Sequence, residues 1–148
     1  MTTVLVTGAT GTVGKHVVTA LSERPGAMRV GLRDPDAAPP GLGDADVAAF
    51  DFEKPETWGP ALADVDGVFL MRPPTVDAAT VAEFAEAAAR VGVSQIAYLS
   101  TLGAERIAVS PHRRIEKRIV ATGAGYTLLR ASFFMQNLLE VHRADVVE

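Results

Sequence analysis

The sequence predicts an α/β fold in which about six strands form a doubly wound parallel sheet with helices on both faces. Short apolar runs rich in β-branched residues alternate with longer segments of helical period, a rhythm typical of parallel strands joined by crossover helices. A glycine-rich turn separates the first apolar run from the first helical segment. With 148 residues, 48% of them hydrophobic and 22% charged, the chain fits one compact domain. We therefore expect residues 1–148 to form a single domain.

The first βαβ unit is expected within the first third of the chain. An apolar run at residues 4–6 predicts the first strand, and a helix is expected from about residue 12 to residue 23. Arg24-Pro25-Gly26 then ends this helix, and residues 29–32 are predicted to form the second strand. The loop that follows is rich in Ala, Pro and Gly and runs to about residue 45.

The middle of the chain repeats the same alternation. Residues 47–50 and 67–70 predict the third and fourth strands, with a short helix near residues 56–62 between them. Pro73-Pro74 ends the fourth strand. Residues 77–91 give the clearest helix, because their apolar side chains share one face at helical spacing.

Two more strands and two more helices are expected in the last third. Residues 95–99 predict the fifth strand, and a helix capped by Ser110, with Pro111 just inside it, should end near Gly123. Residues 126–129 predict the sixth strand, and residues 133–141 a last helix.

The glycine turn has the spacing of a dinucleotide-binding motif. Gly8 permits the tight turn out of the strand, Gly11 lets the backbone approach a pyrophosphate, and Gly14 lets the helix pack closely on the sheet. Free amides at the helix start would face the diphosphate, and the alternative is a glycine-rich turn without a ligand. The cofactor contacts expected in this segment are Thr7, Gly8, Thr10, Gly11, Thr12, Val13 and Gly14.

A nucleotide-triphosphate loop is the competing phosphate motif, and the sequence does not fit it. That motif needs a glycine where this chain has Ala9, and a Ser or Thr where it has His16. The three histidines are far apart and lack acids at ligand spacing, so no metal site is expected. Ser100 is not in the G-x-S-x-G elbow of a hydrolase.

The residue after the second strand bears on the choice of coenzyme. Arg33 lies where an NAD site usually has an acid, and a guanidinium is a bidentate partner for the 2′-phosphate of NADP(H). NADP(H) is therefore favoured over NAD(H). In the alternative, Arg33 is a solvated loop charge and Asp34 binds the ribose.

The other strand exits are where a ligand of a doubly wound sheet would lie. Ser100 and Thr101 could bind the nicotinamide ribose or a substrate oxygen, or could satisfy local backbone groups of a turn. Phe133, Phe134 and Met135 could form an apolar wall for a flat acceptor or belong to the core. The further expected contacts are Met71, Arg72, Ser100 and Thr101 for the cofactor, and Arg130, Phe133, Phe134 and Asn137 for the substrate.

Composition narrows the list of partners and compartments. The net charge of -4 offers no basic field for nucleic acid. The chain has no cysteine, which excludes thiol chemistry and thiolate metal sites. There is no basic leader at the start and no apolar run long enough for a membrane span. We expect a cytoplasmic protein with a small-molecule substrate and no direct nucleic-acid or membrane partner.

Nearly the whole chain resembles the atypical short-chain dehydrogenase/reductases, and within them the NmrA-like and quinone-reductase-like proteins. The resemblance is carried by the segments Thr7-Gly8-Ala9-Thr10-Gly11, Leu32-Arg33-Asp34-Pro35, Tyr98-Leu99-Ser100, Gly125-Tyr126-Thr127-Leu128-Leu129-Arg130 and Phe134-Met135-Gln136-Asn137. It implies a Rossmann domain, NADPH as hydride donor, and a quinone or small carbonyl as acceptor.

The chain departs from this family in its catalytic residues. Short-chain dehydrogenases usually act through a Tyr and a Lys four positions later, but neither tyrosine here has such a lysine. The corresponding stretch runs from His112 to Glu116, which share a helix face. His112 could donate a proton or position a carbonyl while Glu116 orients the ring, or the two could be an ordinary helical pair. The candidate catalytic residues are His112, Glu116 and Ser100.

Length is the second departure. Relatives of this kind continue into a smaller C-terminal region that closes over the substrate, and we expect that region to be missing from these 148 residues. Either the sequence is a fragment of a longer protein, or another subunit of a homo-oligomer covers the site and the exposed edge of the sheet. Two functions are consistent with the sequence: an NADPH-dependent reductase of a quinone or small carbonyl, and a non-catalytic NADP(H)-binding redox sensor of the NmrA-like type.

Overall fold

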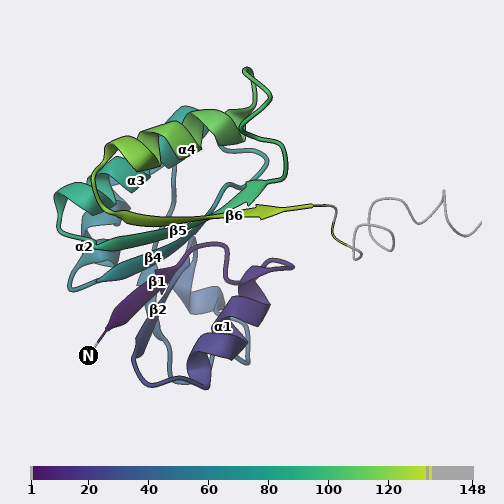
Figure 1. Cartoon of the computed structure of the whole chain (residues 1–148). Coiled ribbons are helices and arrows are strands. Elements are labelled where there is room, and N and C mark those ends of the chain that lie inside the picture. The colour runs from purple at the N-terminus through teal and green to yellow at the C-terminus, as the bar shows by residue number, and fades with distance from the viewer. Residues whose placement is uncertain (1, 133, 135–148) are drawn as a thin grey trace, which may run out of the picture.

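A single parallel sheet forms the centre of the computed structural model, which describes residues 2–132 and residue 134. Its strand order is β3-β2-β1-β4-β5-β6, and every neighbouring pair is parallel (Figure 1). This is the strand order of dinucleotide-binding sheets, with the switch point between β1 and β4. The strands are β1 (Thr3–Val6), β2 (Ala27–Leu32), β3 (Asp46–Ala49), β4 (Gly67–Met71), β5 (Gln95–Thr101) and β6 (Gly125–Ala131).

Helices cover both faces of the sheet, as the sequence predicts. α1 lies against one face, and α3 and α4 lie side by side on the other (Figure 1). The helices are α1 (Gly14–Ser22), η1 (Pro35–Ala37), η2 (Pro55–Thr57), α2 (Trp58–Leu62), α3 (Ala78–Arg90) and α4 (Pro111–Ala121). No helix among the described residues has the length and hydropathy that crossing a membrane requires.

The larger core lies between the sheet and α2, α3 and α4. Side chains of Val68 and Leu70 from β4 and of Ile96 and Tyr98 from β5 face these helices and are buried. Phe84 of α3 is at the centre of an edge-to-face aromatic cluster. Its partners in that cluster are Phe50, Phe52 and Trp58. The sheet face that carries Tyr98 is therefore fixed rigidly against α3 and α4.

The smaller core lies on the α1 side of the sheet. Val18 of α1 packs with Val6, Val30 and Phe69 from the three central strands. Towards β6 this face is less covered, and the side chain of Leu129 is 42% exposed. The two faces are thus unequal: three helices bury one, and one helix buries part of the other.

Several element boundaries differ from the sequence expectation. β2 begins two residues earlier than expected, at Ala27, and α1 begins at Gly14. β5 and β6 both run two residues past the expected ends, because Ser100 pairs with Arg130 and Thr101 with Ala131 in the ladder. A search for apolar runs cannot detect such polar strand residues. Ser110 occupies the N-cap position of α4, but its side chain makes no capping hydrogen bond. The expected last helix, at residues 133–141, lies outside the described residues apart from Phe134.

Candidate functional site

The glycine turn joins β1 to α1 at the carboxyl edge of the sheet. Gly8 has a φ of +64°, in the left-handed region that favours glycine, and a Cβ there would overlap the side chain of Met71 at the end of β4. A Cβ on Gly14 would overlap the backbone of Gly8 itself. Gly14 therefore lets the start of α1 pack on the turn, which refines the expectation that it packs on the sheet.

The start of α1 presents unused hydrogen-bond donors. Within the described part of the chain, the amides of Thr12, Val13 and Gly14 donate to no acceptor, and no acidic side chain occupies the first turn. Val13, at the N-cap position, has no side chain that could accept a hydrogen bond. These amides, together with the helix dipole, form a site of the kind that binds phosphate.

Thr7 has a structural task in the turn. Its hydroxyl is fully buried, donates to the carbonyl of Phe69 at 3.1 Å and accepts from the amide of Met71 at 3.1 Å. This pair of hydrogen bonds fixes the end of β1 against the end of β4. The Thr7 side chain thus positions the turn, and its hydroxyl is already engaged.

Two adjoining hollows lie beside the turn, across the carboxyl ends of β1, β2 and β3. We call them together the nucleotide hollow. Thr10, Leu32, Arg33 and Asp51 line both parts. The inner part is further lined by Gly8, Ala9, Gly31, Phe50, Phe52, Glu53, Pro73, Thr75 and Val76, and the outer part by Asp34, Ala37, Pro39 and Lys54.

The outer part of the nucleotide hollow carries two cations. Arg33 and Lys54 both line it, and within the described residues Arg33 forms no ion pair. Asp34 is the N-cap of η1, where its Oδ1 accepts from the amide of Asp36 at 3.1 Å. One oxygen of the acid that could bind a ribose is therefore used by its own loop.

Sequence reasoning did not identify the residues that follow β3. Asp51, Phe52 and Lys54 lie at the same carboxyl edge as the glycine turn and line the nucleotide hollow. A ligand of a doubly wound sheet lies at the carboxyl ends of the strands, and these residues follow the third strand directly. The same criterion that indicated the residues after the other five strands therefore applies to them as well.

A partly buried ionic cluster links β5, α4 and β6 on the other side of the switch point: Ser100 and Glu116 are buried, and the Arg130 side chain is 34% exposed. Ser100 is 2% exposed, and its hydroxyl donates to Oε1 of Glu116 at 2.6 Å. The Arg130 guanidinium donates to both oxygens of Glu116, from Nε at 3.0 Å and from Nη2 at 2.9 Å. Arg130 lowers the pKa of Glu116 against the opposing effect of burial, and Ser100 assists it. Glu116 is thus an ionised, fully engaged carboxylate.

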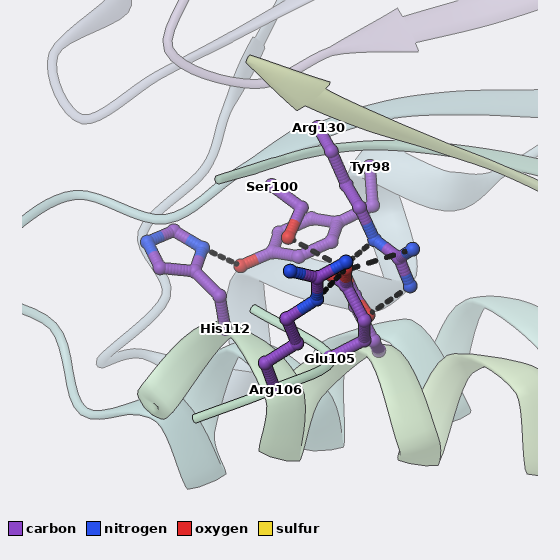
Figure 2. A network of polar contacts seen from close by, with 7 residues as sticks. Tyr98, Ser100, Glu105, Arg106, His112 and Arg130 are labelled. Carbon is purple, nitrogen blue, oxygen red and sulfur yellow. Dashed lines mark hydrogen bonds and ion pairs between the residues drawn. The ribbon is translucent and has the colours of Figure 1, made fainter. Parts of the chain in front are cut away.

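His112 has a different partner from the one the sequence suggested. The sequence assigned the orientation of its ring to Glu116, but in the structure the hydroxyl of Tyr98 lies 2.7 Å from Nδ1 of His112 (Figure 2). Burial lowers the pKa of His112, the Arg72 guanidinium lowers it further, and Glu116 opposes them. His112 and Glu116 share a helix face, as expected, but they belong to two separate polar groups.

Arg72 follows β4 and lies between the two halves of the edge. One of its Nη atoms donates to the carbonyl of Pro74 at 3.4 Å, while its Nε is buried and has no hydrogen-bond partner among the described residues. The guanidinium influences the pKa values of both Tyr98 and His112. A buried donor without an acceptor is uncommon, and it marks this position as one where a ligand atom is expected.

The remaining candidates are divided by the structure. Thr101 is exposed, and its place in β5 puts it on the sheet face opposite Ser100. Phe134 is partly exposed, whereas Phe133 and Asn137 lie outside the described residues. The structure thus brings together the turn residues with Arg33, and Ser100 with Glu116 and Arg130, but it does not describe the expected substrate wall.

The comparison with protein families gives one match over most of the chain. The NAD(P)H-binding family model matches residues 8–145. Among curated proteins, Prestalk A differentiation protein A of Dictyostelium discoideum is 36% identical over 143 residues, which is 93% of this chain and 46% of that protein.

Solved structures of reductases share the fold. Triphenylmethane reductase of Citrobacter sp., complexed with NADP(H), superposes with a TM-score of 0.81 at 26% identity over 97% of this chain and 55% of that one. The NADPH-dependent quinone oxidoreductase QOR2 of Escherichia coli, complexed with NADPH, has a TM-score of 0.79 at 29% identity over 95% of this chain and 53% of that one. The chain therefore spans about half the length of these relatives.

Proposed function

This chain belongs to the NAD(P)H-binding family, and we propose that it is an NADPH-dependent reductase of a quinone or a related small carbonyl compound. The observation that carries the proposal is the nucleotide hollow, which is lined by the first residues of the glycine turn and by two cations, Arg33 and Lys54. The same turn leads into the unused amides at the start of α1. Similarity to NADPH-binding reductases of quinones and dyes supports the choice of reaction.

The residues of the hollow fit a dinucleotide part by part. The amides of Thr12 and Val13 are available to the pyrophosphate. The inner part, between the glycine turn and Phe52, has the apolar wall and polar rim that an adenine ring requires. Asp51 uses one carboxylate oxygen for the amide of Glu53 at 3.0 Å, which leaves the other for a donor of the base.

The preference for NADP(H) is supported by charge. Arg33 and Lys54 would face the 2′-phosphate from β2 and from the segment after β3. Asp34 would repel a phosphate, but its carboxylate is turned into the cap of η1. Two cations at this end make a phosphate more favourable there than a bare ribose hydroxyl.

Bound NADPH supplies the hydride for reduction of the acceptor. The chain binds the dinucleotide at the edge of β1–β3 and leaves the exits of β4 and β5, with Arg72 and His112, for the nicotinamide end and the acceptor. Neither side chain needs to act as a strong acid, since reduction of a quinone gives a delocalised, comparatively stable oxyanion.

The test is a spectrophotometric assay of the protein with NADPH and a panel of quinones. Loss of the reduced-nicotinamide absorbance at a rate proportional to protein concentration is expected, with an NADPH rate well above the NADH rate. Tight NADPH binding without turnover of any quinone or small carbonyl in the panel would contradict the reductase assignment.

The same outcome would support a second candidate, an NADP(H) redox sensor. One observation favours it: neither tyrosine is followed four residues later by a lysine, and both oxygens of Glu116, in the stretch that the resemblance sets against that motif, are engaged by Ser100 and Arg130. The sensor is distinguished by a change of conformation or of partner binding between NADP⁺ and NADPH in the absence of any acceptor.

A further inference from the structure

The Tyr98 side chain is enclosed by the protein, and its hydroxyl has one partner. Tyr98 is 0% exposed within the larger core, below α3 and α4. Among the hydrogen bonds of the described residues, its hydroxyl makes only the one to Nδ1 of His112, at 2.7 Å. The two rings lie with their centroids 5.9 Å apart and are tilted by 34°. Figure 2 shows the second ring nitrogen of His112 directed away from Tyr98.

Burial decides the direction of this hydrogen bond. A phenol has one proton, and a neutral imidazole has one protonated and one free nitrogen. If Nδ1 carried the proton, the Tyr98 hydroxyl would accept, and its own proton would be buried among apolar side chains without an acceptor. If Nδ1 is free, the hydroxyl donates to it and no buried donor is left unpaired.

The charged surroundings agree with a neutral ring. The groups that face His112 are Arg72 after β4, Tyr98 on β5 and Glu116 on its own helix. Burial and Arg72 lower the pKa of His112 more than Glu116 raises it, so the ring is neutral near pH 7. Burial also raises the pKa of Tyr98 well above its usual value, so the phenol keeps its proton.

We propose that Tyr98 is a positioning residue that holds neutral His112 in the tautomer protonated on Nε2, so that the ring offers an N–H donor to the oxygen of the bound acceptor. This inference rests on the proposed function for the identity of the acceptor. The role of the ring is to bind and polarise a carbonyl or quinone oxygen, and no proton leaves it. Ser100, Glu116 and Arg130 then fix the helix that carries the ring to β5 and β6.

The direct test is the nitrogen-15 NMR spectrum of the histidine rings in the full chain. His112 should give a single neutral tautomer with Nε2 protonated and Nδ1 free, whereas exposed His16 should show the averaged signals of two tautomers. In Tyr98→Phe the Nδ1-protonated form of His112 should appear and its pKa should rise, since a hydrogen bond to the neutral ring is lost. A wild-type ring protonated on Nδ1, or a spectrum unchanged in Tyr98→Phe, would overturn the inference.

A kinetic test separates positioning from a purely structural role. Tyr98→Phe should lower kcat for the acceptor roughly three- to tenfold, the loss expected for one hydrogen bond, with unchanged affinity for NADPH. Tyr126→Phe is the matched control, because Tyr126 lies on neighbouring β6 and is 46% exposed. Equal kcat values for the wild type and Tyr98→Phe would contradict the role. If no acceptor is reduced, the proposed function fails, while the spectrum still decides the tautomer.

Discussion

The two halves of the carboxyl edge of the sheet, at β1–β3 and at β5–β6, differ in whether their polar groups have hydrogen-bond partners. Around β1, β2 and β3, main-chain amides and the cation of Arg33 are left without partners in the described structure. Around β5 and β6, the side chains are paired: Glu116 is fully engaged, and His112 is bonded to Tyr98. The first half is arranged to receive a charged ligand, and the second is arranged to hold its own side chains in fixed positions.

Among the substitutions considered, one at Gly14 should reduce NADPH affinity most. Gly14→Ala places a Cβ against the backbone of Gly8, so the start of α1 must move away from the turn. We expect NADPH affinity to fall roughly a hundredfold or more, which corresponds to about 2.7 kcal/mol. Isothermal titration calorimetry measures the NADPH affinity of the variant, and thermal unfolding shows whether the variant is still folded.

Gly59→Ala is the matched control for that substitution. Gly59 lies in α2, where an added Cβ meets no atom within 4 Å. NADPH binding should be unchanged in this variant. Similar losses of affinity in the two variants would show that the Gly14 contact has no special bearing on the ligand.

Arg33 tests whether the unpaired cation faces a phosphate. Arg33→Glu should weaken NADPH binding by about 1.5–3 kcal/mol, roughly ten- to a hundredfold, because a charge-assisted hydrogen bond is replaced by repulsion. NADH binding should change little. Parallel titrations with both coenzymes measure the ratio, and equal losses for NADPH and NADH would contradict the 2′-phosphate role.

Glu116 tests the paired half through stability. Its pKa is lowered in the folded protein, so the stabilisation is fully present above the unfolded value of about 4.3 and is lost as the pH falls through the folded-state pKa. Glu116→Gln should lower the free energy of unfolding by about 2 kcal/mol at neutral pH, and the gap to wild type should narrow below about pH 4.3. Urea unfolding at several pH values measures the gap.

Glu86→Gln is a matched control for that experiment. Glu86 forms a two-bond pair with Arg118 between α3 and α4, at 2.7 and 2.8 Å, but both side chains are about one-third exposed. Solvent screening should reduce its contribution to about 0.5 kcal/mol. The two arginines are about equally exposed, and the carboxylates differ, with Glu116 6% and Glu86 32% exposed. If Glu86→Gln lowered the free energy of unfolding as much as Glu116→Gln, burial of the Glu116 carboxylate would not be what distinguishes the two pairs.

Lys54 is expected to have a smaller effect than Arg33. It lines the outer hollow and is exposed, and Lys54→Gln removes a charge without reversing it, so NADPH binding should weaken only about threefold. NADH binding should be unaffected. The titrations used for Arg33→Glu would detect the change, and a loss of NADH affinity of the same size would argue against contact with the 2′-phosphate.

The sequence predicted the first half of the edge better than the second, for a physical reason. The glycine turn and Arg33 depend on contacts within one βαβ unit, so their spacing along the chain is enough to find them. The hydrogen bonds that join Ser100, Glu116 and Arg130 depend on the register of β5 with β6 and on how α4 lies across these strands. A short stretch of sequence shows neither the register nor the position of the helix.

Tyr98 illustrates the same limit. In the sequence, Tyr98 belongs to a segment that resembles the family, and no lysine follows it four positions later. An alternating strand gives no sign that its hydroxyl reaches a helix that starts 13 residues later, at Pro111. Lys54 and Asp51 were accessible in principle, because they follow a predicted strand. A contact such as the one between Tyr98 on β5 and His112 on α4 joins elements that are separate in the sequence, and only the structure identifies it.

Titration of the protein with NADPH and NADH is the decisive measurement for the proposed coenzyme site. Binding should be saturable at one site per chain, with NADPH bound at least tenfold more tightly than NADH because Arg33 gains a charged partner. Absence of binding by either coenzyme, with the fold intact by circular dichroism, would contradict the proposed site.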